Sequence, residues 1–493
     1  MRFGLWGTFD LENFGDMLYP RIVRRELTRR VPGIEVLPFG PIGTVGHNRF
    51  EDGLEATPAA PLGTWSPARL AELAAQLDVV AIGGGDIIHG RDAGLADHYG
   101  LEPEDLRRRH THRFFCEGLV DHGVLTAWLA VGVPEPPDAG MEELLRDAVG
   151  RFEYVSVRDE GSAERLREAG VEADIEIVPD PAFLTPRLLA PEEIAERIHA
   201  LRAADAFPRG RPALLVQGTQ PLLRSVDAIA EQVTAIVTEH DVEPVLVETG
   251  PLHGDDEFAD ALAERLPGAR RLPASAGADD LIAALASCQA YLGSSLHGGI
   301  VAAAFDKTWL MLDLVELAKR RGVAAMLGAE ERVVTDAAGI ADAFRAARER
   351  GSLAPRLAEL EHAADAAFDR LAALATSAPV HAVAPAPVSD DAANVRLLPD
   401  GDRRAIVAQS LFADERDRRL LREAEVADVL ARTKQIEDWN LELDAGNHDR
   451  DRRIAELDAD AQALRDRLEH VRFRDWLLAS PPGRALRRRR SSA

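Results

Sequence analysis

One segment with the residue types for acid–base chemistry lies where a short apolar run ends. The run at 290–293 is followed by Ser294-Ser295-Leu296-His297-Gly298-Gly299 and then by a second apolar run at 300–305. His297 therefore stands at a predicted strand-to-helix junction, and histidine exchanges protons near neutral pH. This position favours a catalytic role for His297, and a histidine that only completes a loop or the core is the alternative.

A second candidate is the arginine that ends another apolar run, in Ser156-Val157-Arg158-Asp159. The guanidinium group binds carboxylates and phosphates through two parallel hydrogen bonds. Arg158 is therefore a candidate anion-binding residue. A purely structural pair with Asp159 or a nearby acid is the alternative, and the spacing alone favours that pair.

A third candidate lies between the first predicted strand and the first predicted helix, in Asn13-Phe14-Gly15-Asp16. Backbone amides at a helix N-terminus attract anions, and glycine allows close approach of a ligand. Asn13 and Asp16 are therefore candidates for a ligand contact. Asp16 as a simple helix cap is an equally good interpretation.

A glycine run follows a further predicted strand, in Gly83-Gly84-Gly85-Asp86. Three glycines let a ligand or another backbone approach closely. The segment has neither the Gly-x-Gly-x-x-Gly fingerprint nor the lysine of a P-loop, so a dehydrogenase or a P-loop nucleotidase is unsupported.

His253 and Asp255 follow another predicted strand and are further candidates for a ligand-binding cleft. Five histidines crowd the region after the glycine run, at His89, His98, His110, His112 and His122. Their spacing matches no zinc motif, and we expect them in a polar loop or an acceptor pocket. No metal or organic cofactor is predicted.

The elements that position these residues are short apolar runs that alternate with helical patterns such as 17–30. The runs lie at residues 2–6, 78–82, 124–131, 154–157 and 175–178, and again at 213–217, 244–248, 290–293 and 309–312. Continuous apolar strands separated by helices indicate parallel sheets covered on both faces. We therefore predict two tandem Rossmann-like α/β domains, at 1–185 and 186–375, which face each other across a ligand-binding cleft.

The rest of the chain has a different character. Residues 376–405 are rich in proline and alanine and predict an extended linker. Residues 406–478 carry a heptad pattern, which predicts a coiled coil or, alternatively, one amphipathic helix folded onto the body. The coil could form within one chain or between two chains, and the second case would make the protein a homo-oligomer. The arginine-rich terminus at 479–493 either contacts anionic lipid or is solvated.

Charge and cysteine content exclude several classes of protein. The 493 residues carry a net charge of −25, and residues 401–493 hold 20 basic and 19 acidic residues, which leaves −26 for the first 400. This excess of acidic residues in the first 400 positions argues against broad nucleic-acid binding. Two cysteines exclude a disulfide scaffold. Without a signal-peptide pattern or a long apolar run, we expect a cytoplasmic protein, with contact to the inner face of the membrane left open.

Five segments together resemble the polysaccharide pyruvyl transferase family. They are NFGD at 13–16, DVVAIGGGD at 78–86, VSVRDEGSAERL at 155–166, VPDPAF at 178–183 and SSLHGGIVAAAF at 294–305. The resemblance covers residues 1–330. It implies a fold like that of two-domain (GT-B) glycosyltransferases, with the acceptor on the N-terminal side and the donor on the C-terminal side. It also implies transfer of the enolpyruvyl group of phosphoenolpyruvate to sugar hydroxyls of a cell-surface or exopolysaccharide saccharide, giving a pyruvate ketal.

In this family the donor site lies around the positions that correspond to Arg158, Leu296 and His297. Many members carry an arginine two residues before the histidine, where this sequence has Ser295. Either another arginine compensates for that cation, or the donor differs, or activity has been lost. The alternatives are a nucleotide-sugar glycosyltransferase of similar fold and a non-catalytic scaffold of a polysaccharide assembly complex.

Overall fold

The computed structural model describes residues 1–41, 43, 50, 59–62, 67–89, 119–137, 139–250, 253–314, 318–378 and 462. The chain divides into two compact units, Met1–Ser410 and Leu411–Ala493. The predicted linker beyond residue 378, the heptad segment apart from Gln462 and the basic terminus lie outside the described residues. Among the described residues, no helix combines the length and the apolar character needed to cross a membrane.

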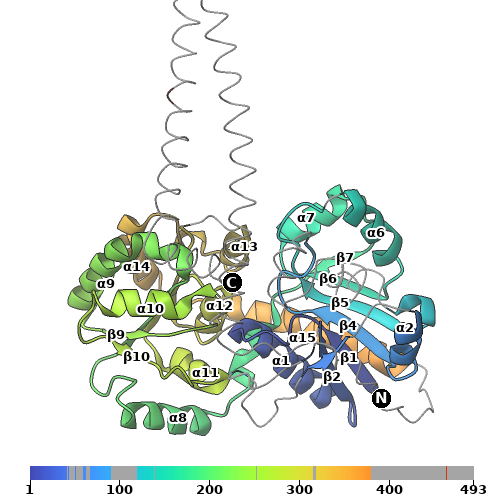
Figure 1. The fold of residues 1–493 in the computed structure, drawn as a ribbon, viewed down its shortest axis with the longest axis horizontal. Coiled ribbons are helices and arrows are strands. Elements are labelled where there is room, and N and C mark those ends of the chain that lie inside the picture. Colours follow the sequence, from blue (N-terminus) through green and yellow to red (C-terminus); the bar gives the residue numbers. More distant parts are fainter. Residues whose placement is uncertain are drawn as a thin grey trace, which may run out of the picture. The chain divides into compact units, whose positions relative to one another are not determined.

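The first half of unit Met1–Ser410 is built on a seven-stranded parallel sheet (Figure 1). Its strands, in spatial order, are β3 (Ala60–Pro61), β2 (Glu35–Gly40), β1 (Arg2–Trp6), β4 (Val79–Gly83), β5 (Leu125–Val131), β6 (Tyr154–Val157) and β7 (Ile175–Ile177). The strand order reverses direction between β1 and β4. In open parallel sheets ligands bind outside the carboxyl ends of the strands at such a reversal.

The second half repeats this arrangement with a six-stranded parallel sheet. Its strands, in spatial order, are β10 (Arg270–Arg271), β9 (Glu243–Leu246), β8 (Ala213–Gln217), β11 (Ala290–Gly293), β12 (Thr308–Leu312) and β13 (Val333–Val334). Here the order reverses between β8 and β11. The prediction of two parallel-sheet α/β halves is confirmed.

Helices connect the strands in both halves. In the first half they are α1 (Phe14–Arg30), α2 (Pro67–Ala74), η2 (Val120–His122), α6 (Ala139–Val149) and α7 (Glu160–Glu168). The segment η3 (Pro181–Arg187) leads into α8 (Pro191–Ala203), η4 (Gln220–Ser225), α9 (Val226–His240), α10 (Asp255–Ala263), α11 (Ala278–Ser287), α12 (Leu296–Ala304), α13 (Ala318–Met326), η6 (Glu330–Arg332), η7 (Ala337–Gly339), α14 (Ile340–Arg350) and α15 (Ala354–Ser377).

The strands are continuous apolar runs in the sequence because both faces of each sheet are covered. On one face of the first sheet, residues such as Leu5 and Ala81 pack with α1. On its other face, Val80 and Trp128 pack with α2, α6 and α7. In the second half, α9, α10 and α14 cover one face of the sheet and α11 and α12 the other (Figure 1).

The two halves share one apolar cluster, which contains side chains of α1, η3, α12 and α15. A buried ion-pair group adds to this contact. Arg21 of α1 pairs with Asp279 of α11, and Arg197 of α8 donates to the other oxygen of Asp279 at 2.8 Å. A buried carboxylate that is paired on both oxygens holds its partners in one arrangement, so the group helps to fix α1 against α11.

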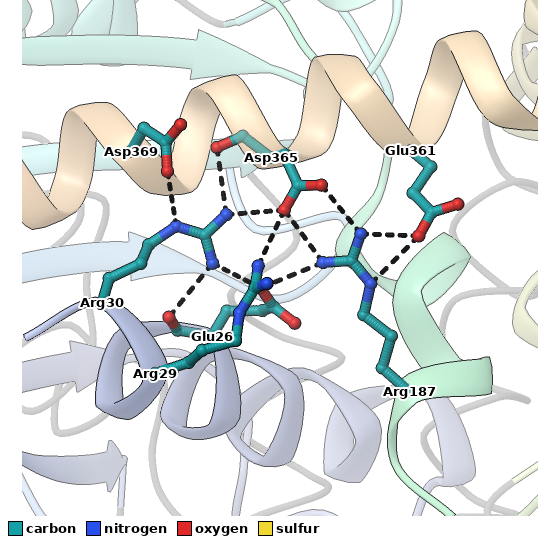
Figure 2. Close-up of polar contacts among 7 residues, drawn as sticks. All are labelled: Glu26, Arg29, Arg30, Arg187, Glu361, Asp365 and Asp369. Carbon is teal, nitrogen blue, oxygen red and sulfur yellow. Dashed lines mark hydrogen bonds and ion pairs between the residues drawn. The ribbon is translucent and has the colours of Figure 1, made fainter.

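Helix α15 returns from the second half to the first and is held there by charged side chains (Figure 2). Glu26 of α1 is 1% exposed and accepts hydrogen bonds from Arg29, Arg30 and Arg187. Burial alone would raise the pKa of the Glu26 carboxyl, but these hydrogen bonds hold it below its ordinary value. The same arginines reach the acids of α15, at Glu361, Asp365 and Asp369.

We expect Arg187→Met to lower the free energy of unfolding by about 1–2 kcal/mol, because the cluster is only partly shielded from solvent. Arg187 alone links η3 to both Glu26 and Asp365 among the contacts of Figure 2. Chemical denaturation measures the loss. The control is Arg345→Met, which removes exposed ion pairs to Glu239 and Asp342 and should cost less than 0.5 kcal/mol, roughly the size of a surface pair. Equal losses in the two variants would contradict this prediction.

Candidate functional site

The predicted site residues follow the carboxyl ends of parallel strands. Asn13, the glycine run and His297 follow β1, β4 and β11, which flank the two order reversals, whereas Arg158 follows β6 and His253 follows β9. Asn13 caps α1 by accepting hydrogen bonds from the amides of Gly15 at 2.9 Å and Asp16 at 3.4 Å. Asp16 is therefore the third residue of the helix rather than its cap. Asn13 also approaches the second half, where its Nδ2 lies 3.4 Å from Nε2 of His253.

A backbone hydrogen bond joins the same two segments. The amide of Phe14 donates to the carbonyl of Thr249 at 2.8 Å. Two candidates that are 240 residues apart in sequence, Asn13 and His253, are thus brought together. The N-terminus of α1 is therefore part of the junction between the halves.

His297 is the second residue of α12 and lies against the N-terminus of α1. A Cβ atom on Gly15 would overlap the imidazole ring of His297, so the missing side chain of Gly15 makes room for that ring. The imidazole Nε2 lies 3.5 Å from Oδ2 of Asp180, and the His297 side chain is 16% exposed. The ring is thus held on two sides and still reaches solvent.

Asp180 stands at the start of η3, between the two halves, and is 3% exposed. Its Oδ1 accepts a hydrogen bond from the amide of Ala182 at 2.9 Å. Burial alone would raise the pKa of the Asp180 carboxyl, but the hydrogen bond from His297 and the charges of His297 and Arg158 hold it below its ordinary value. Asp180 is therefore a fixed negative charge that faces both predicted donor-site residues.

Arg158 is enclosed by carboxylates. It pairs with Asp86, its Nε lies 3.5 Å from Oδ2 of Asp159, and Asp180 acts on its charge. Burial alone would lower the pKa of the Arg158 guanidinium, but these three acids raise it. Arg158 is only 2% exposed. The alternative of a structural ion pair is thus realised, with Asp86 as well as Asp159.

The glycine run has its space filled largely by the protein itself. A Cβ on Gly83 would overlap the hydroxyl of Tyr19, and one on Gly84 would approach the ring of Phe9 to 2.7 Å. Beside Gly85 the nearest atom is Oδ1 of Asp16, at 3.7 Å. Gly84 and Gly85 both have positive φ angles, of 109° and 106°, which other residues rarely adopt. The run therefore serves close packing first, and only Gly85 leaves room for a ligand.

Ser295 and Leu296 begin α12. The Ser295 hydroxyl accepts a hydrogen bond from the amide of Gly298 at 3.2 Å, which makes it the helix cap. Leu296 is buried. Asp255 was expected beside the cleft, but it is buried and linked to Ser295 through the side chain of Gln217.

Two residues of this region were not among the predicted site residues. Asp180 belongs to the VPDPAF segment, whose position after a short strand was the available signal. Gln217 ends a strand and shows no motif that distinguishes it from an ordinary core residue. Contacts between segments far apart in sequence give both their importance here.

Among the described residues, no group of three or more His, Cys, Asp or Glu side chains is placed to hold a metal ion. Of the five crowded histidines, His98, His110 and His112 lie outside the described residues.

We expect Gly15→Ala to lower turnover at this site by about tenfold to a hundredfold, because the added methyl group displaces the His297 ring and misplacement of a reacting group by about 1 Å has effects of this size. Steady-state kinetics measures the loss. Gly339→Ala is the control, since a Cβ there meets nothing within 4 Å. Unchanged turnover in Gly15→Ala would show that the ring position is unimportant.

A sequence model of the polysaccharide pyruvyl transferase family matches residues 13–314, more than half of the chain. The chain belongs to the polysaccharide pyruvyl transferase family. The match begins at Asn13 and includes Arg158, Asp180 and His297. In this chain, the helices α13, α14 and α15 lie beyond the matched residues.

A comparison with curated proteins finds no match. Solved structures similar to this chain include the UDP-GlcNAc 2-epimerase of Neisseria meningitidis bound to UDP-GlcNAc, with 13% identity and a TM-score of 0.46. That match covers 76% of this chain and 100% of the epimerase chain. A UDP-N-acetylglucosamine 2-epimerase of Rickettsia bellii has 12% identity and a TM-score of 0.46, and the match covers 76% of this chain and 96% of that chain. A glycosyltransferase of Rickettsia africae has 11% identity and a TM-score of 0.43, and the match covers 76% of this chain and 96% of that chain.

Proposed function

We propose that this protein transfers the enolpyruvyl group of phosphoenolpyruvate to hydroxyls of a saccharide and so forms a pyruvate ketal. Membership of the polysaccharide pyruvyl transferase family supports the reaction class. The observation that carries the proposal is the pair of His297 and buried Asp180 at the junction of the two halves, with Arg158 acting on the same carboxylate.

The reaction needs one proton donor. Protonated His297 gives its proton to the methylene carbon of phosphoenolpyruvate, which makes C2 electrophilic. One acceptor hydroxyl attacks C2, the C2–O bond to phosphate breaks, and a second hydroxyl then forms the second C–O bond of the ketal. Of the two hydroxyl protons, one restores His297 and the other leaves with inorganic phosphate.

Asp180 supports this role electrostatically. Oδ2 of the buried Asp180 carboxylate lies 3.5 Å from Nε2 of His297 and places a negative charge beside the ring. Asp180 also holds the ring in one orientation, as the carboxylate partner of a catalytic histidine does in other enzymes. We therefore assign Asp180 a positioning role and His297 the proton transfer.

Donor binding requires a rearrangement around Arg158. The donor carries a phosphate and a carboxylate, and both suit an arginine fork. Because Asp86 already pairs with Arg158, an anionic donor has to displace it. Ser295 supplies no cation, so the backbone amides and dipole at the N-terminus of α12 are the remaining favourable partners for the donor on that side.

The test compares donors. Phosphate release from phosphoenolpyruvate, in the presence of candidate saccharides, should depend on the saccharide, and phosphoenolpyruvate should raise the unfolding temperature. Stabilisation by a nucleotide sugar alone would instead favour a glycosyltransferase, the second candidate that Ser295 keeps open. No stabilisation and no turnover with either donor class would favour a scaffold.

The acceptor, location and assembly follow from the same proposal. We expect a saccharide destined for the cell surface or for an exopolysaccharide, and transfer on the cytoplasmic side. Contact of the basic terminus with the membrane and oligomerisation through the heptad segment remain predictions, since both segments lie outside the described residues.

A further inference from the structure

Gln217 lies beneath the helix that carries His297. It is the last residue of β8 and is fully buried. Its side-chain oxygen accepts hydrogen bonds from the amides of Ser294 at 2.9 Å and Ser295 at 2.8 Å. Ser295 caps α12 and precedes His297 by two residues. The carboxamide of Gln217 thus binds the backbone immediately before the proposed acid.

Asp255 fixes the orientation of that carboxamide. Its Oδ2 accepts a hydrogen bond from Nε2 of Gln217 at 2.9 Å, and two more from the amide and hydroxyl of Thr249 at 2.7 and 2.9 Å. An ionised carboxylate only accepts hydrogen bonds. The NH₂ group of Gln217 must therefore face Asp255, and its oxygen must face the Ser294 and Ser295 amides.

A third contact completes the support of this turn. Arg320 of α13 donates from Nε to the carbonyl of Ser294 at 2.9 Å and from Nη1 to Asp313 at 2.6 Å. The backbone at Ser294 is thus held at its amide by Gln217 and at its carbonyl by Arg320. Buried polar groups that are satisfied on both sides restrict a segment to one conformation.

We propose that Gln217 and Asp255 are positioning residues that set the first turn of α12 and thereby place His297 for proton transfer. This inference rests on the proposed function. It extends the site to a second layer of side chains that contact neither the donor nor the acceptor.

Burial of the ionised Asp255 carboxylate lowers the stability of the fold, which supports a role for Asp255 other than stabilisation of the fold. Burial raises the pKa of its carboxyl to about 6, with the charge of Glu248 adding to the rise and hydrogen bonds from Thr249 and Gln217 opposing it. A raised pKa in the folded state means that ionised Asp255 destabilises the fold above pH 6. The protein nevertheless keeps an acid at this buried position.

Two single variants and one double variant test the proposal. Gln217→Met should lower kcat about tenfold to a hundredfold with little change in KM. Asp255→Asn should lower kcat severalfold, because a neutral oxygen accepts the Gln217 hydrogen bond more weakly than a carboxylate, and should leave the unfolding temperature at pH 7.5 unchanged or higher. Glu257→Gln, in the same turn of α10 but exposed, is the control and should match the wild type.

The double variant combines Gln217→Glu with Asp255→Asn. It removes the repulsion between two facing carboxylates, so kcat should recover in part relative to Gln217→Glu alone, while the Thr249 amide, which only donates, keeps the recovery incomplete. No recovery, or a Gln217→Met variant that loses stability while keeping the wild-type kcat, would contradict a positioning role.

A measurement without turnover separates this inference from the proposed function. The ring resonance of His297 in protein with ¹³C-labelled histidine, assigned by its loss in His297→Ala, should shift in Gln217→Met and stay in place in Glu257→Gln. An unshifted resonance overturns the inference. Absence of turnover in the wild-type protein with phosphoenolpyruvate would instead overturn the proposed function.

Discussion

Replacement of His297 by alanine is expected to lower kcat by about 10²–10⁴-fold, the usual contribution of a positioned acid or base. In the proposed reaction His297 is the residue assigned to protonate the methylene carbon of the donor. The side chain is only 16% exposed and pairs with buried Asp180, so its loss also removes some packing and one partner of that carboxylate. We therefore expect a folded protein with a modestly lower unfolding temperature, while phosphate release falls.

A histidine elsewhere in the chain provides the control. His199 lies exposed on α8, and His199→Ala should have wild-type kinetics. Phosphate release and thermal unfolding should be measured for both variants under the same conditions. Turnover by His297→Ala at the wild-type rate would remove His297 from the mechanism, whereas a folded but inactive variant supports it.

The second large effect is expected on stability, from Arg158→Met. This change leaves Asp86, Asp159 and Asp180 without the guanidinium that they share. Breaking a buried ion pair by removing one partner costs about 3–5 kcal/mol, because the remaining charge stays buried. Chemical denaturation at pH 7.5 should show a loss of this order, and donor binding should be lost as well.

The pH dependence of that loss has a definite sign. In the wild type the pKa of Asp180 is held below its ordinary value, so its contribution to stability is present above the unfolded pKa, about 3.9, and disappears as the pH falls through the folded value. In Arg158→Met the pKa of Asp180 should rise, because one of the charges that lower it is removed while the hydrogen bond from His297 remains. The difference in stability between variant and wild type should therefore be greatest near neutral pH and shrink as the pH falls towards 4.

An arginine on the neighbouring helix is the control for this variant. Arg167 of α7 pairs with Glu160 at 2.9 Å, and both side chains are exposed. Arg167→Met should cost less than 1 kcal/mol, roughly the limit for surface pairs. Adding Asp86→Asn to Arg158→Met should recover part of the loss, since one buried negative charge is removed. A loss for Arg158→Met that is no larger than for Arg167→Met would mean that the acids do not depend on Arg158.

Most strands of the fold could be predicted from the sequence, and the exceptions have clear causes. The strands β1, β6, β8 and β11 have the predicted bounds, because each is a continuous apolar run. The strand β2 was not predicted, since Pro38 interrupts it and proline is unusual inside a sheet. Helix α1 begins at Phe14 rather than at residue 17 because Asn13 caps it.

The places of the candidate site residues could be predicted where a position after a strand was enough. His297, Arg158 and Asn13 follow strands, and parallel strands in this topology bring such positions to one edge of each sheet. Surroundings that come from distant segments could not be predicted. The sequence left open whether a ligand or another part of the chain approaches the glycine run, and the structure places Tyr19 beside Gly83 and Phe9 beside Gly84.

The sequence by itself therefore determined the two parallel-sheet halves, the family and the strand-end positions of Arg158 and His297, because these depend on local apolar runs and on the order of motifs. The tertiary structure alone decided which charges meet. It places Asp180 beside His297, and Gln217 beneath Ser295, through contacts between segments more than 70 residues apart. In an acidic body the partners of each buried cation determine what else it can bind, and only the folded chain specifies those partners.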